Sequence, residues 1–274
     1  MEALLMAPAN SSGLWTKIYE AYQLRAAKRF FQRRVVKTNA VPLISFTFDD
    51  FPQTALHTGG AILKTHQLRG TFYTSLGLTG RDAPVGKIFL RDDLDTLLAD
   101  GHELGCHTFD HAHSWKTAPK NFEDSIIENQ RSLNKIFPGI SFKTLSYPIS
   151  VPRPHTKRRM SKHFTCCRGG GQTFNVGAMD LNYLHAFFLE KAKNILAVKE
   201  IIQRNAQARG WLIFATHDVS DQPTRFGCTP KFFAEVVEQS IESGARILPV
   251  GEACQIAIAN AEIPASKIQA SFFN

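Results

Sequence analysis

The sequence predicts an α/β protein built on a mainly parallel sheet. Beyond Asn39, short apolar runs typical of buried strands alternate with longer stretches in which apolar residues recur at helical spacing. Alternation sustained over this length indicates parallel strands joined by helical crossovers. Seven or eight such units predict a closed or nearly closed barrel, with an open doubly wound sheet as the alternative.

The individual elements follow from these patterns along the chain. Residues 41–48, VPLISFTF, form a run typical of a buried parallel strand, and residues 211–216 form the strongest later strand. Residues 150–180 are rich in proline, glycine and basic residues, so we expect loops there. Further strands are expected at 71–75, 103–107, 144–147, 164–167 and 247–250, and helices at 55–67, 91–100, 121–136, 190–208 and 230–243.

The first 40 residues differ from the rest of the chain in charge. They hold seven basic and two acidic residues, whereas the whole chain has a net charge of +8. Residues 14–37 have helical apolar spacing and no proline or glycine, which predicts a basic amphipathic helical extension (1–40) ahead of a main domain (41–274). The basic face is expected either to be solvated or to contact anionic lipid headgroups. Nucleic acid is the weakest interpretation, because no recognised binding motif is present.

Composition narrows the class of protein. Hydrophobic residues make up 43% of the chain, which suffices for a full core and argues against disorder. The five cysteines include no CxxC pair, which argues against a disulfide framework or a zinc ribbon and favours a reducing compartment. No targeting segment and no apolar run of about 18 residues is evident, so we expect a cytoplasmic protein.

Titratable side chains follow three of the predicted strands. Asp49 and Asp50 come directly after the first strand, His107 ends the third with His111 four residues on, and His217 follows the seventh. Because the carboxyl ends of parallel strands share one end of a barrel, these residues are expected to meet there. A DD pair, an HxxxH pair or a single histidine is weak evidence alone, since each has ordinary structural roles such as helix capping.

The residue types indicate metal-assisted chemistry. Adjacent carboxylates repel unless they share a cation or proton, and one carboxylate with two imidazoles is a common metal-binding set that leaves positions open. Zinc fits this set, and other divalent transition metals fit as well. Spacing alone leaves the choice of ligands open, because Asp110 and His113 lie in the same HTFDHAH stretch.

Three motifs together resemble a known family. SFTFDD, CHTFDH and FATHD are similar to the motifs of the NodB-type polysaccharide deacetylases, carbohydrate esterase family four, over about residues 41–255. The resemblance implies a distorted (β/α)7-type barrel. It also implies Asp49 as catalytic base, His217 as general acid and Thr108 as the hydroxyl that steadies the ligand loop. The implied ligands of a divalent metal, zinc first with cobalt, nickel or manganese as alternatives, are Asp50, His107 and His111.

The sequence departs from the family pattern at several positions. Phe51 replaces the usual glycine after the DD pair and is expected at the rim of the pocket. The arginine that usually orients the base is missing from the third motif; Arg168, paired with Asp180, is the first candidate to replace it, and Arg153 the second. Ala215 stands where the family often has a leucine that walls the acetate pocket.

The implied reaction is sugar N-deacetylation. Asp49 would take a proton from water, the metal and a backbone N–H near Tyr147 would hold the developing oxyanion, and His217 would protonate the leaving amine. Residues 151–179 are basic without any acid, which favours a nucleotide-diphosphate or lipid-diphosphate carrier, against a plain solvated basic helix. The alternatives are another C–N hydrolase acting on a non-sugar amide or imide, and an inactive binding barrel.

Overall fold

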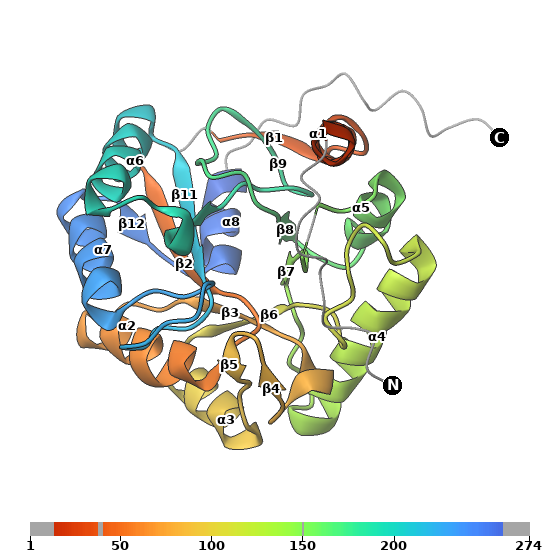
Figure 1. Ribbon diagram of the computed structural model, residues 1–274, viewed down its shortest axis with the longest axis horizontal. Helices are drawn as coiled ribbons and strands as arrows, with labels where there is room; N and C mark the ends of the chain where they lie inside the picture. The colour runs from red at the N-terminus through yellow and green to blue at the C-terminus, as the bar shows by residue number, and fades with distance from the viewer. Residues whose placement is uncertain (1–13, 38–40, 150, 260–274) are drawn as a thin grey trace.

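In the computed structural model, which describes residues 14–37, 41–149 and 151–259, parallel strands form a ring with helices around it (Figure 1). The main sheet has eight strands in the order β10-β11-β2-β3-β6-β7-β8, and β12 also pairs with β2. Their bounds are β2 Leu43–Phe48, β3 Thr71–Thr74, β6 Glu103–Cys106, β7 Thr144–Ser146, β8 Cys166–Arg168, β10 Phe187–Phe188, β11 Trp211–Thr216 and β12 Arg246–Ile247.

One segment closes the ring. Leu184 forms a parallel bridge with Arg168 of β8, and β10, which begins three residues later, pairs in parallel with β11. The segment of residues 181–188 therefore pairs with β8 at one end and, through β10, with β11 at the other. The strands curl into a distorted barrel, which confirms the predicted fold class over the doubly wound alternative.

Helices cover the outside of the ring and fill one of its ends. α2 is preceded by a π-helical turn at Ala55–Gly60, and a short hairpin of β4 and β5 follows β3. The bounds are α2 Ala61–Thr65, α3 Arg91–Ala99, α4 Pro119–Ile136, α5 Pro154–Met160, α6 Ile195–Ala208, α7 Pro230–Glu242, α8 Val250–Ile258, β4 Asp82–Ala83 and β5 Gly86–Lys87. No helix in the described ranges has both the length and the hydropathy to cross a bilayer.

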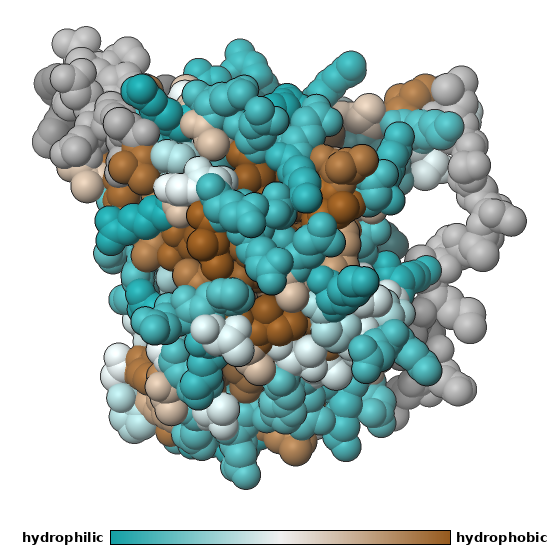
Figure 2. Space-filling model, turned by 90° about the vertical axis from the view of Figure 1, so that its left-hand side faces the viewer, coloured by the Kyte–Doolittle hydropathy of each residue, from teal (hydrophilic) through white to brown (hydrophobic). Residues whose placement is uncertain are grey.

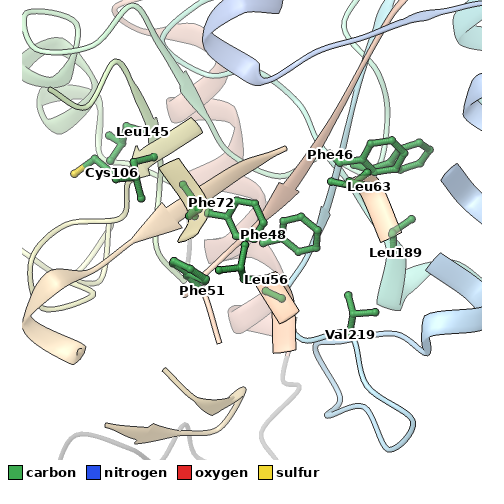
Figure 3. Close-up of a cluster of buried hydrophobic side chains, with 14 of the residues drawn as sticks. Phe46, Phe48, Phe51, Leu56, Leu63, Phe72, Cys106, Leu145, Leu189 and Val219 are labelled. Carbon is green, nitrogen blue, oxygen red and sulfur yellow. The ribbon is translucent and has the colours of Figure 1, made fainter. Parts of the chain in front are cut away.

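Alternation along β2 divides the core into two layers. Ile44, Phe46 and Phe48 belong to an outer cluster between strands and helices, whereas Leu43 belongs to an inner cluster with residues of α8. Figure 3 shows the outer cluster, in which the ring of Phe48 stacks on Phe72 with centroids 4.5 Å apart. On the face that carries α6 and α7, hydrophilic side chains surround a band of apolar ones (Figure 2).

The N-terminal region differs from the expected single helix. α1 spans Leu14–Arg29, and β1 (Arg34–Val36) pairs antiparallel with β9 (Ala178–Asp180). Phe31 has a positive φ of 48°, which ends the helical path. Beyond it, Val35 and Val36 are β-branched residues that favour a strand. The predicted extension therefore contributes a strand that pairs with the main body.

Two further expectations are corrected. Residues 151–180 hold α5 and β9 in addition to loops and to β8, which overlaps the strand expected at 164–167. The strand expected at 247–250 stops at Ile247, and α8 begins at Val250, because Pro249 supplies a fixed φ at the start of a helix.

The outer cluster generates a stability prediction. Phe46 is buried and stacks on Phe214 with centroids 5.5 Å apart. Phe46→Ala is expected to lower the free energy of unfolding by about 3–5 kcal/mol in a denaturant titration, because a buried ring leaves a cavity. Leu196→Ala, at a side chain that is 68% exposed on α6, is the control and should change it by less than about 1 kcal/mol. Equal losses would contradict this description of the core.

Candidate active site

Three side chains converge at the carboxyl end of the barrel. Asp50 follows β2, and His107 and His111 lie in the segment after β6. The Nε2 atoms of His107 and His111 lie 3.4 and 3.1 Å from Asp50 Oδ1. One donor atom from each residue fits within a 4.8 Å span, so these three side chains could hold one metal ion.

The state of these donors fits a divalent metal. His107 donates its Nδ1–H to the carbonyl of Ser146 at 2.8 Å, which leaves the Nε2 lone pair facing Asp50. Burial lowers the pKa of His107 to about 4, so its imidazole stays neutral at neutral pH. Asp50 Oδ1 is buried and has no hydrogen-bond partner within the described residues, as expected of an oxygen placed to ligate a cation.

The backbone that carries these donors is strained. Asp50, Phe51, Thr108 and His111 have positive φ angles of 59°, 50°, 63° and 56°, a conformation that costs non-glycine residues energy. The Thr108 hydroxyl accepts the N–H of Ala112 at 2.8 Å and thereby ties the loop between the two histidines. Strain of this kind persists only where the surrounding structure enforces it, and it is common at functional sites.

A buried ion pair lies beside the candidate metal ligands. Arg168, at the end of β8, donates from Nη2 to Asp49 Oδ1 and, at 2.7 Å, to the Ser146 hydroxyl. Its Nη1 donates to the Gly169 carbonyl, and its guanidinium lies 5.0 Å from the ring centroid of Tyr73. The arginine predicted to replace the missing motif residue is therefore in contact with the predicted base.

Competing effects set the ionisation of Asp49. Burial alone would raise its pKa, but the charge and hydrogen bond of Arg168, with the neighbouring imidazoles of His107 and His217, hold that pKa well below the ordinary range. Asp49 is thus ionised at neutral pH. Arg168 occupies Oδ1 and leaves Oδ2 to accept a proton.

His217 approaches the same centre from the end of β11. Its Nδ1–H donates to the Phe226 carbonyl at 3.1 Å, and its Nε2 lies 4.0 Å from Asp50 Oδ2. Because a carbonyl only accepts, Nδ1 carries a proton and Nε2 is the nitrogen that faces Asp50. The structure thus brings all five residues that follow the three predicted strands to one place.

Three other candidates lie elsewhere. Asp110 accepts from the Ser125 hydroxyl at 2.6 Å, and the His113 Nδ1 accepts from the Trp115 N–H at 3.2 Å, so neither joins the cluster. Arg153 donates from Nε to the Trp115 carbonyl and is not beside Asp49. The sequence left these three residues as candidates for the site, and their positions in the structure exclude them from it.

The predicted pairing of Asp180 with Arg168 is wrong. Asp180 forms an ion pair with the buried Lys157 of α5 and accepts the Arg33 N–H at 2.9 Å. It therefore joins α5 to the β1–β9 ribbon. The physical reason is that Asp180 ends β9 beside β1, whereas the Arg168 side chain points across the barrel to Asp49.

Phe51 does not lie at the pocket rim, contrary to expectation. It is completely buried and stacks on Phe89 with centroids 4.8 Å apart. It also packs against Phe72 with centroids 5.1 Å apart (Figure 3). The positive φ values at Asp50 and Phe51 turn the backbone so that the ring enters the outer core. Phe51 thus anchors the Asp50 turn and does not line a substrate position.

The expected oxyanion donor near Tyr147 also needs correction. The Tyr147 N–H donates to the Arg168 carbonyl at 3.0 Å and extends the pairing of β7 with β8, while Pro148 has no N–H. The Tyr147 hydroxyl donates to the Asn182 carbonyl at 3.3 Å. Ala215 is buried in the inner core cluster. The Tyr147 amide is therefore already used within the sheet.

Glu190 is a partly buried acid near the site that the sequence reasoning missed. It follows β10, and its carboxylate is close enough to His217 and Asp49 for their charges to affect it. Burial raises the pKa of Glu190 to about 6, and its Oε2 is buried without a hydrogen-bond partner among the described residues. A search for acids that follow predicted strands could have found it only if β10 had been predicted, and a two-residue strand gives too little signal in the sequence.

Comparison with known proteins supports the family resemblance that the motifs indicated. The polysaccharide deacetylase family model matches residues 37–163, just under half of the chain, which confirms the resemblance. Among curated proteins, no sequence matches this chain.

Solved structures share the fold at low sequence identity. A chitin deacetylase from Colletotrichum lindemuthianum is 19% identical with a TM-score of 0.56, over 80% of this chain and 89% of that one. Bacillus subtilis PdaA, a family 4 carbohydrate esterase, is 15% identical with a TM-score of 0.52, over 89% and 90%. A family 4 acetyl xylan esterase from Clostridium thermocellum, solved with a cobalt ion, is 18% identical with a TM-score of 0.51, over 77% and 89%.

The raised pKa of Glu190 predicts a pH-dependent stability difference. A carboxyl whose pKa is higher when folded contributes stability below its unfolded pKa of 4.5, and that stability is lost as the pH rises through about 6. Glu190→Gln removes this pH-dependent loss of stability, because the amide does not ionise. Its free energy of unfolding relative to the unmodified chain should therefore rise by about 2 kcal/mol between pH 4 and pH 7 in urea titrations. A pH-independent difference would contradict the raised pKa.

Proposed function

We propose, because residues 37–163 match the polysaccharide deacetylases, that this chain removes an N-acetyl group from a sugar by metal-assisted hydrolysis. The observation that carries the proposal is the convergence of Asp50, His107 and His111 between the Asp49–Arg168 pair and His217. This arrangement provides a metal-binding set, an ionised carboxylate and an imidazole within one site.

The donor set determines which metal would bind and what it would supply. Asp50, His107 and His111 would hold a divalent ion, zinc first and cobalt, nickel or manganese as alternatives, because one carboxylate and two imidazoles suit these borderline metals. When bound, the ion would polarise the acetyl carbonyl and lower the pKa of water.

The two flanking groups divide the proton transfers. Asp49, kept ionised by Arg168, takes a proton from the attacking water through Oδ2. His217 delivers a proton from Nε2 to the leaving amine, while its Nδ1–H bond to Phe226 fixes the ring. Acetate and a free amino sugar result.

The alternative of a C–N hydrolase for a non-sugar amide or imide loses its two supports. Phe51 had suggested an unusual pocket rim, but its ring packs in the core. The missing motif arginine had suggested an altered base, but Arg168 contacts Asp49 from another strand. The site residues therefore favour the sugar deacetylase.

We further propose a substrate on an anionic carrier, a nucleotide diphosphate or lipid diphosphate, in the cytoplasm, with peripheral membrane contact through the N-terminal helix. Within the basic segment, Lys157, Arg159 and Arg168 pair with acids. Arg158 and Lys162 are exposed and line a cleft on α5 with Lys120 and His155, which supports an anionic ligand.

Acetate release tests the proposed activity. Purified protein should release acetate from soluble N-acetylglucosamine oligomers, lose this activity with a chelator and regain it with added zinc. Asp49→Asn should lower kcat at least about 100-fold, because proton transfer by a positioned base contributes that much. His113→Ala is the matched control and should retain activity. Full activity in Asp49→Asn, or activity that a chelator leaves unchanged, would refute the proposed roles.

A further inference from the structure

We propose that one face of α1 binds the surface of an anionic bilayer and thereby turns the site-bearing end of the barrel towards the membrane. The face consists of Trp15, Ile18 and Tyr22 with the cations around them. The role in presenting lipid-linked substrate rests on the proposed deacetylase activity, whereas the membrane contact itself does not.

The apolar side chains of α1 are unusually exposed. Trp15, Ile18 and Tyr22 are 81%, 48% and 59% exposed, and their spacing of three and four residues places them on one side of the helix. Ala26 and Ala27, which follow on the same helix, are buried. Trp15 and Ile18 face solvent, and more than half of Tyr22 stays exposed although its ring also contacts Trp115, which indicates a surface that contacts another phase or partner.

Exposed cations that form no ion pair among the described residues lie on α1 and on the neighbouring α5, and Arg158 also lies over the ring of Phe31, 5.4 Å from its centroid. Lys17, Arg25 and Arg29 on α1, and Arg158 and Lys162 on α5, are exposed, and none lies within 4.0 Å of a carboxylate in the described part of the chain. The two helices are adjacent, because Lys157 Nζ donates to the Ala27 carbonyl at 2.7 Å. The combined surface is both aromatic and positive.

This chemistry fits a lipid headgroup layer best. Tryptophan and tyrosine prefer the boundary between headgroups and acyl chains, and lysine and arginine attract anionic lipids. A second copy of the same face would bring like charges together, which opposes pairing. A nucleic acid would neutralise the cations but would leave Ile18 and Trp15 in water.

Contacts with the site-bearing loop fix the orientation of α1. The Trp115 indole N–H donates to the Tyr19 hydroxyl at 2.9 Å, and the ring of Tyr22 meets Trp115 edge-on at 6.1 Å. Trp115 lies four residues beyond His111, in the segment that leaves the carboxyl end of β6. The first half of α1 is therefore at the end of the barrel that holds the candidate ligands, where a membrane-bound substrate would be presented.

Vesicle binding tests the proposal, with Trp15 as reporter, since Trp115 and Trp211 are buried and Trp15 is 81% exposed. Tryptophan emission should shift to the blue with vesicles of equal parts phosphatidylcholine and phosphatidylglycerol, but not with phosphatidylcholine alone. The double variant Ile18→Ser/Arg25→Glu keeps the reporter. It should bind at least about 25-fold more weakly, because Arg25→Glu changes the charge by two and each unit of charge near an anionic surface changes the affinity about five-fold.

A matched control on another face separates specific from general effects. Leu196→Ser/Arg204→Glu makes the same chemical changes on α6, on the face shown in Figure 2, and should bind as the unmodified chain does. Equal losses in both variants, or equal binding to uncharged vesicles, would overturn the proposal. So would a dimer in sedimentation that the α1 variant disrupts while no vesicle binding occurs.

The same variants distinguish this proposal from the proposed activity. Acetate release from soluble oligomers without vesicles should be equal in the α1 variant and the unmodified chain. A chain that binds vesicles but releases no acetate would refute the activity and support the membrane contact. Loss of acetate release in the α1 variant, with vesicle binding retained, would show that α1 supports the site and does not dock on lipid.

Discussion

The buried ion pair between Asp49 and Arg168 is the interaction on which the site depends. Two charges removed from water are costly unless each is paired and hydrogen-bonded. Arg168 pairs with Asp49 and donates to the Ser146 hydroxyl and the Gly169 carbonyl, and only its Nε has no hydrogen-bond partner among the described residues. Because the pair joins the end of β8 to the end of β2 across the ring, it can form only when the barrel closes. Folding and ionisation of the base are thus coupled.

Two of the candidate metal ligands have strained backbone conformations, and packing in the core keeps them in place. Asp50 and His111 occupy left-handed backbone conformations, and Phe51, in the same turn, is locked by stacking on Phe89. The Thr108 hydroxyl bond to Ala112 ties the loop between the two histidines. The strained turn after β2 and the strained loop after β6 therefore keep the three donor side chains close together. Contacts among the donors alone would not hold them there.

Sequence reasoning succeeded where a long apolar run or a strand-end motif carried the signal. β11 matches its predicted bounds, and the five residues after three strands meet at one end of the barrel. It failed where the decisive feature was a backbone angle or a distant partner. The inward turn of Phe51 depends on two positive φ values, and Asp180 pairs with Lys157 because β9 lies beside β1. Glu190 follows a strand too short to recognise.

Metal content measured on matched ligand variants tests the central claim most directly. The unmodified chain and His113→Ala should each retain one divalent ion per chain after desalting, measured by mass spectrometry of the metals. Asp50→Ala and His107→Ala should each lose it, because two remaining donors bind a borderline metal weakly. Retention of the ion in Asp50→Ala and His107→Ala, or its loss in His113→Ala, would contradict the assignment of Asp50, His107 and His111.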